Sequence, residues 1–203
     1  MCGGRGTRLE SDREKPLHRI RGTTMVERVV DALEASDVES ISAATSPNAP
    51  ETRRLLADDD RVDLVETPGD GYVDDLLAAL DRPDVSTPLL TVPADLPLLE
   101  APTIDRVCAD HGDLNASRTV CVPAAFKRRL GVSDETRLQP NDHLVPTGVN
   151  VVGDPEESHE MTDVRYDYRL AVNVNRLEDA RIAAALLESD GSDARSGGAD
   201  RCA

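Results

Sequence analysis

The sequence has few aromatic residues and few lysines. Its 203 residues include no tryptophan, one phenylalanine and three tyrosines, and the two lysines are Lys15 and Lys127. Acidic residues outnumber basic ones, and the formal net charge is −16. A nucleic-acid backbone needs a basic surface, so this balance excludes nucleic acid as a partner. An acidic, lysine-poor surface is typical of proteins that work in near-saturating salt, where charges are screened within about 3 Å. The composition therefore predicts a halophilic protein.

Long apolar runs and paired cysteines are also absent. No stretch approaches the ~20 apolar residues of a membrane span, and no signal peptide precedes the first motif, which predicts a cytoplasmic protein with no membrane partner. The four histidines are scattered and no C-x-x-C pair occurs, which makes a zinc site improbable. The four cysteines, as small reduced apolar residues, fit the same compartment.

Strand and helix patterns alternate along the chain. They predict one domain over residues 1–188, followed by a disordered acidic tail over 189–203. Helices are predicted over 24–35, 51–57, 72–80, 102–109 and 177–187, and strands over 38–44, 62–66, 88–92, 119–123, 144–152 and 169–174. This order indicates an α/β, Rossmann-like fold with a mixed, mostly parallel sheet and helices on both faces. Ligands of such sheets bind beyond the carboxyl ends of the strands.

A glycine-rich segment at the N-terminus predicts a phosphate site. It reads Gly3-Gly4-Arg5-Gly6-Thr7-Arg8, with Lys15-Pro16 following. Glycines let backbone N–H groups form an anion-binding nest. The Walker spacing is absent, and Leu9 interrupts the dinucleotide pattern. One of two lysines stands here, and an ammonium group is a compact point charge suited to phosphate oxygens.

A strand is expected before such a loop. Only Met1 and Cys2 precede it, so the first central strand is predicted to be truncated. A strand of about 5–6 residues is the norm, and we expect the natural protein to begin about six apolar residues earlier.

Polar residues follow several predicted strands. Asp95 comes after strand 88–92, where a carboxylate beside a triphosphate suits Mg²⁺, although a helix cap before Pro97 is the alternative. Thr45, Ser46 and Asn48 follow strand 38–44. Because parallel strands share one carboxyl edge, these groups are expected to meet the glycine-rich loop.

Several strings resemble known families. The string G-G-x-G-T-R with its later lysine resembles the signature loop of MobA-like nucleotidyltransferases, and residues 171–175 resemble their closing motif. Residues 44–50, 69–76 and 145–152 resemble the archaeal adenosylcobinamide-phosphate guanylyltransferases, of haloarchaeal type. This resemblance implies transfer of GMP from GTP to adenosylcobinamide phosphate with release of pyrophosphate, in cobalamin biosynthesis, by an enzyme that forms a homodimer.

The resemblance also implies roles for individual residues. Arg8, Lys15 and Asp95 would be catalytic, Asp95 and Asn173 would hold Mg²⁺, and Asn175 is expected to cap the following helix. The remaining substrate-binding positions are Gly3, Gly4, Arg5, Gly6 and Thr7 for the triphosphate, Thr45, Ser46, Asn48, Gly71 and Tyr72 for the guanosine, and Gly148 and Asn150 for the acceptor or sugar. Two alternatives stay open. One is another MobA-like guanylyltransferase, with a molybdopterin or phospholactate acceptor, and the other is a GTP-binding regulator without turnover.

Overall fold

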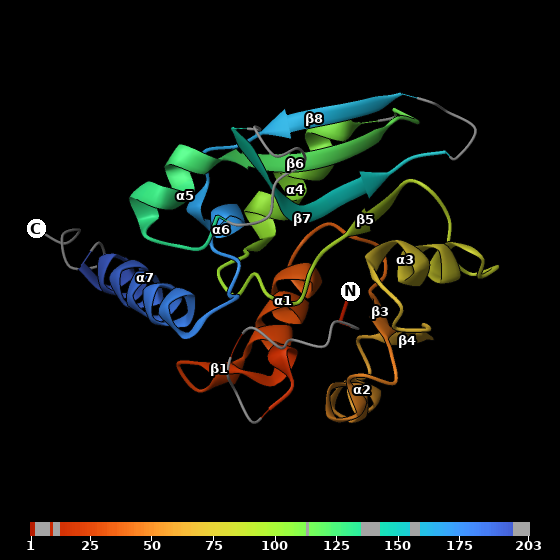
Figure 1. Ribbon diagram of the computed structural model, residues 1–203, viewed down its shortest axis with the longest axis horizontal. Coiled ribbons are helices and arrows are strands. Elements are labelled where there is room, and N and C mark those ends of the chain that lie inside the picture. The colour runs from red at the N-terminus through yellow and green to blue at the C-terminus, as the bar shows by residue number, and fades with distance from the viewer. Residues whose placement is uncertain (3–8, 10–12, 113, 135–142, 155–158, 197–203) are drawn as a thin grey trace, which may run out of the picture.

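The computed structural model describes residues 1–2, 9, 13–112, 114–134, 143–154 and 159–196, with the backbone alone for 191–196 (Figure 1). Among these residues, no helix has the length and apolar character that crossing a membrane requires.

Two sheets form the centre of the fold. In the first, β3 (Ser42–Thr45) pairs in parallel with β4 (Asp63–Glu66). The second has the order β5 (Leu89–Thr91), β7 (Leu144–Val152), β6 (Ser117–Pro123) and β8 (Glu160–Val164). Strand β7 runs antiparallel to β5 and β6, while β8 runs parallel to β6. Figure 1 shows the four-stranded sheet across the top and β3–β4 to the right. The predicted mixed α/β sheet is confirmed.

The first two residues connect the two sheets. The Cys2 N–H donates to the Ala44 carbonyl at 2.9 Å, and the Met1 amino group donates to the Val92 carbonyl at 3.0 Å. The Ala94 N–H in turn donates to the Met1 carbonyl at 3.3 Å. Residues 1–2 therefore lie between β3 and the segment after β5, and the glycine-rich loop begins at that point.

Helix α1 (Met25–Glu34) shows how local sequence sets an element. Thr24 caps it, because the Thr24 Oγ1 accepts from the Glu27 N–H at 3.2 Å and the Glu27 carboxylate accepts from the Thr24 N–H at 2.9 Å. Its apolar stripe, which includes Val29, packs against the core. The other elements are η1 (Lys15–Leu17), β1 (Arg19–Ile20), β2 (Thr23–Thr24), α2 (Pro50–Ala57), α3 (Tyr72–Leu80), α4 (Ala101–His111), α5 (Ala124–Leu130), α6 (Tyr168–Ala171) and α7 (Leu177–Ser196).

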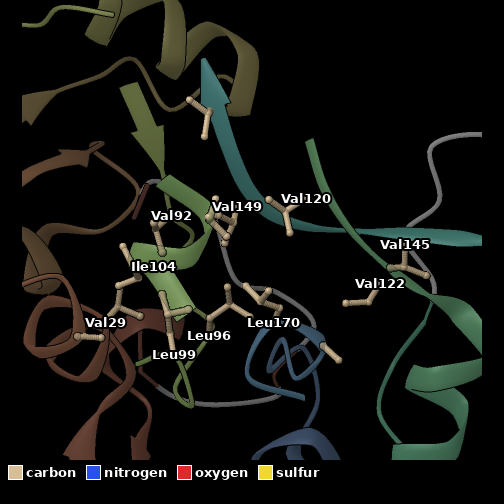
Figure 2. Packing of buried hydrophobic residues seen from close by; sticks show 14 of the residues in the cluster. Val29, Val92, Leu96, Leu99, Ile104, Val120, Val122, Val145, Val149 and Leu170 are labelled. Carbon is tan, nitrogen blue, oxygen red and sulfur yellow. The ribbon is translucent and has the colours of Figure 1, made fainter. Parts of the chain in front are cut away.

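The largest core cluster lies between the four-stranded sheet and helices α1 and α4 (Figure 2). Burial alternates along β7, so that Val145, Val149 and Val151 face inward. Val120 and Val122 of the neighbouring β6 are fully buried beside them. Each such side chain contributes about 1.5–3 kcal/mol relative to exposure. This packing fixes the strands whose ends carry the polar residues.

The predicted strand over 169–174 is wrong. Residues 168–171 form α6, because the Asp167 carboxylate accepts from the Arg169 N–H at 2.9 Å and starts a helical turn. After it, the Val174 N–H donates to the Asp95 carbonyl at 2.9 Å. That segment therefore bonds to the chain after β5 without being a strand. Sequence patterns also missed α5 and β8.

Helix α7 extends through residues 189–196, where the sequence predicted a disordered tail. Once a helix has formed, each further residue adds one hydrogen bond for the dihedrals it fixes, so even a segment of Gly, Ser and Asp can continue it. The Tyr168 hydroxyl also donates to the Asp190 carboxylate at 2.6 Å. Residues 197–203 of the predicted tail lie outside the described residues.

Candidate active site

Lys15 and Asp95 form the centre of a polar cluster. The Lys15 ammonium group donates to the Asp95 Oδ2 at 2.6 Å and to the Asn175 Oδ1 at 2.8 Å. The Lys15 and Asp95 side chains are each 19% exposed, so a ligand can reach both. The three residues are 80 or more positions apart, and only the fold brings them together.

The segment that carries Lys15 is tied to the N-terminus of α2. Glu14 precedes the 3₁₀ turn η1, and its carboxylate accepts from the N–H groups of Glu51 and Thr52 at 2.8 and 2.7 Å. The Thr52 hydroxyl donates to it at 2.6 Å. A carboxylate is favoured there, because the N-terminus of α2 presents unpaired N–H groups. Glu14 thereby anchors Lys15 over the cluster.

Asn173 and Lys127 lie beneath Asp95. The Asn173 Nδ2 donates to the Asp95 Oδ1 at 3.2 Å and to the Thr147 carbonyl at 2.8 Å. The Lys127 ammonium group donates to the Asn173 Oδ1 at 3.1 Å and to the Ala171 carbonyl at 2.7 Å. Lys127 is 2% exposed, and burial lowers its pKa to about 8, against the effect of the nearby carboxylates. No sequence pattern pointed to a role for Lys127.

Asp179 holds the segment that presents Asn175. Its carboxylate is buried and accepts from the N–H groups of Asn175 and Arg176, both at 2.9 Å. It also accepts from the Ser133 N–H at 2.9 Å. Asn175 was expected to cap the following helix, but its side-chain oxygen instead accepts from Lys15. Asp179, four positions later, supplies the capping oxygen.

A second cluster lies where α3 meets β5 and β7. The Tyr72 hydroxyl is 2.9 Å from the Thr91 Oγ1, and the Asn150 Nδ2 donates to the Tyr72 oxygen at 2.9 Å. Gly148 shares this region with a φ of 86°, and a Cβ on it would stand 2.8 Å from the Pro93 Cγ. A glycine is therefore required where β7 passes the segment after β5.

A third cluster joins the ends of β3 and β4. The Asn48 Nδ2 donates to the Gly69 carbonyl at 2.9 Å, and the Asn48 N–H donates to the Ser46 Oγ at 3.2 Å. Gly69 has a φ of 80°, and a Cβ there would stand 2.5 Å from the Asn48 Nδ2. Thr45 is buried, and its hydroxyl has no hydrogen-bond partner among the residues that the structure describes. Gly71 follows this turn and precedes α3 as its N-cap residue.

The structure thus gathers the sequence-predicted residues into three groups at strand ends. Lys15, Asp95 and Asn173 form the first, Tyr72 with Asn150 the second, and Ser46 with Asn48 the third. No described hydrogen bond joins the second group to the third. The predicted residues Gly3, Gly4, Arg5, Gly6, Thr7 and Arg8 lie outside the described residues.

Asp95 can hold a hard cation only together with other oxygens. Within the part of the chain that the structure describes, no group of three or more His, Cys, Asp or Glu side chains is arranged for a metal ion. Mg²⁺ is commonly held by one or two carboxylates plus substrate phosphates, which a single accessible carboxylate such as Asp95 fits. Asn173, however, presents Nδ2 to Asp95, and a ligating amide would present its oxygen.

The family model of the MobA-like NTP transferase domain matches residues 1–193. The chain belongs to this family. It is also 32% identical, over 200 residues, to the adenosylcobinamide-phosphate guanylyltransferase of Methanocaldococcus jannaschii, covering 94% of this chain and 97% of that protein. The resemblance to the MobA-like nucleotidyltransferases and to the adenosylcobinamide-phosphate guanylyltransferases is therefore confirmed.

Other proteins resemble this chain in sequence or in fold. The bifunctional protein GlmU of Limosilactobacillus fermentum is 31% identical over 62% of this chain and 28% of its own length. A solved 4-diphosphocytidyl-2C-methyl-D-erythritol synthase superposes with a TM-score of 0.62 at 14% identity, covering 85% of this chain and 92% of that one. CMP:2-keto-3-deoxy-manno-octonic acid synthetase gives a TM-score of 0.57 at 16% identity, covering 90% and 96%. The two structural likenesses show the nucleotidyltransferase fold.

Proposed function

We propose that this family member transfers GMP from GTP to adenosylcobinamide phosphate and releases pyrophosphate, in cobalamin biosynthesis. The observation that carries the proposal is the near full-length similarity to a guanylyltransferase of that name. The Lys15–Asp95 pair supports it, because the pair supplies a cation for phosphate and a carboxylate for a metal ion, and Ala94, next to Asp95, bonds to Met1.

In the proposed reaction, an acceptor phosphate oxygen forms a bond to the α-phosphorus of GTP. The bond between that phosphorus and the bridging oxygen to the β-phosphate breaks, and pyrophosphate leaves with the electron pair. A phosphate monoester has a second pKa of about 6, so it attacks as an anion without a general base. Catalysis then depends on positioning and on neutralising charge.

The proposed roles follow from position. Lys15 leaves Asp95 to bind the leaving pyrophosphate, and Arg8 assists it, while backbone amides of residues 3–7 bind the triphosphate. Asp95 would hold Mg²⁺, which would neutralise charge on the phosphates when bound. Asn48 and its neighbours, together with Tyr72, would line the guanosine, since they lie at the ends of β3, β4 and β5. Gly148 and Asn150 would face the acceptor or the sugar.

Three further properties complete the proposal. The enzyme would work in the cytoplasm, at high salt and as a homodimer. The net charge of −16 supports the high-salt setting, since concentrated ions screen its self-repulsion.

The test is a transfer assay in concentrated KCl with Mg²⁺ and labelled GTP. We expect pyrophosphate release and a GDP-cobinamide product by mass spectrometry with cobinamide phosphate as acceptor, and much less product with ATP, CTP or UTP. Parallel reactions contain molybdopterin, phospholactate or N-acetylglucosamine 1-phosphate. If product forms with one of these compounds and not with cobinamide phosphate, the proposed acceptor is wrong. If the protein binds GTP but releases no pyrophosphate under any condition, it is not a guanylyltransferase, and the result would favour a GTP-binding regulator.

A further inference from the structure

Lys127 is a buried cation that the proposed reaction leaves without a role. It lies on α5, which packs beside α6 (Figure 1), and its ammonium group bonds to the carbonyl of Ala171 and to the side chain of Asn173. Burying a charge costs free energy unless hydrogen bonds compensate it. A lysine at 2% exposure, in a chain with two lysines, therefore calls for an explanation beyond packing.

The neighbours of Asn173 fix which way its amide points. An ammonium group can only donate, so the atom that faces Lys127 is the oxygen. A backbone carbonyl can only accept, so the atom that faces Thr147 is the nitrogen. The second hydrogen of that nitrogen is directed to the Asp95 Oδ1. Rotating the amide by half a turn would reverse all three interactions at once.

The Thr147 carbonyl owes its place to an irregularity in β7. Thr119 of β6 pairs with Asn150 of β7, and Cys121 pairs with Pro146. Between these two pairs β7 advances by four residues while β6 advances by two. Such a bulge redirects backbone groups that a regular ladder would pair. The Thr147 hydroxyl steadies it by donating to the Val120 carbonyl at 2.9 Å.

We infer that Lys127 is a positioning residue. Its ammonium group, together with the Thr147 carbonyl, fixes the Asn173 amide as a hydrogen-bond donor to Asp95. Asn173 therefore orients the Asp95 carboxylate and is not itself a ligand for Mg²⁺. The polar chain runs from Lys127 through Asn173 and Asp95 to Lys15, so a residue that touches no substrate sets the geometry of the two that do. The kinetic part of this inference rests on the proposed function.

The kinetic test is a double-mutant cycle in the guanylyl-transfer assay. Lys127→Met keeps an unbranched chain and removes the ammonium group, and Arg128→Met on the exposed face of α5 is the matched control. We expect Lys127→Met and Asn173→Ala each to lower kcat about 10- to 100-fold with little change in the KM for GTP. The double variant should lie within about twofold of Asn173→Ala, whereas independent effects would multiply and overturn the inference.

Two further variants keep the test decisive. Asn173→Asp preserves the shape but has no N–H, so we expect the kcat loss of Asn173→Ala, and near-normal activity would overturn the donor role. Should Lys127→Met fail to fold in thermal unfolding, Lys127→Gln replaces it. The Gln amide can still donate to the Asn173 oxygen, so kcat should stay closer to that of the unaltered enzyme than to that of Asn173→Ala. A kcat no better than that of Asn173→Ala would overturn the positioning role.

A readout without nucleotide or metal separates this inference from the proposed function. In ¹⁵N NMR spectra, the Asn173 side-chain NH₂ signals are those that Asn173→Ala removes. We expect Lys127→Met to shift them and to speed their exchange with water at least tenfold, and Arg128→Met to leave them unchanged. Unchanged signals in Lys127→Met would overturn the inference even if transfer activity is found. Absence of transfer in the unaltered enzyme would refute the function alone.

Discussion

Replacing Lys15 with methionine should affect metal binding and turnover in opposite directions. In the free protein, the Lys15 ammonium group lies 2.6 Å from the Asp95 Oδ2. At that distance two unit charges attract by about 2 to 6 kcal/mol for an effective dielectric constant between about 80 and 20. Both side chains are 19% exposed, and solvent screening places the net effect near the lower end. A cation that approaches Asp95 must displace this lysine.

We therefore expect Lys15→Met to strengthen Mn²⁺ binding to the nucleotide-free protein by about tenfold, since about 1.4 kcal/mol corresponds to a factor of ten. Turnover should fall by about 100-fold or more, because the leaving pyrophosphate loses its cation. Electron paramagnetic resonance measures free Mn²⁺, and the pyrophosphate assay measures turnover, both at one fixed KCl concentration.

Arg19→Met provides the control, because that exposed guanidinium bonds to the Gly22 carbonyl of its own hairpin. It should leave both quantities unchanged. If Lys15→Met leaves Mn²⁺ affinity unchanged or lower, the ion pair does not compete with the metal. If Lys15→Met turns over normally, Lys15 has no place in the mechanism.

Three other predictions concern single side chains. Asp95→Asn should remove most Mg²⁺-dependent turnover while thermal unfolding stays within a few degrees, and an unchanged Mg²⁺ titration would place the ion elsewhere. Gly148→Ala should reduce the free energy of unfolding by about 1–3 kcal/mol in urea. This loss should exceed that of Gly22→Ala, because Gly22 has a similar φ of 88° but nothing within 4 Å of an added Cβ. Equal losses in the two variants would show that the Cβ added by Gly148→Ala does not clash with Pro93. Hydrogen bonds from the Thr24 hydroxyl and N–H lower the pKa of Glu27 below its ordinary value of 4.5. The Glu27 carboxylate should therefore stabilise the folded protein by about 1 kcal/mol above pH 4.5, and this contribution should disappear as the pH falls through the lower pKa of the folded state. The difference in urea stability between the unaltered protein and Glu27→Ala should shrink over that range, and a constant difference would contradict the linkage.

Much of the fold could be predicted from local patterns. Helix 72–80 and strand 144–152 have the predicted bounds, because a strong apolar period and clear Gly or Pro boundaries define each one. The segment after Asp167 could not be predicted in this way. Its run of apolar residues has the composition of a strand, yet a side-chain bond from Asp167 starts a short helix.

The sequence by itself determined the chemistry. The rare lysine at position 15, the carboxylate after a buried strand and the glycine-rich segment predicted a phosphate and metal site, because residue type and spacing decide which charges are available. Only the tertiary structure decided how those groups are oriented. Lys127 and Asn175 act through hydrogen bonds to residues that are distant in the sequence. Asp179 supplies the helix cap that Asn175 was expected to make. The direction in which Asn173 points depends on a lysine from α5 and a carbonyl from a bulged strand, and no local pattern contains that information.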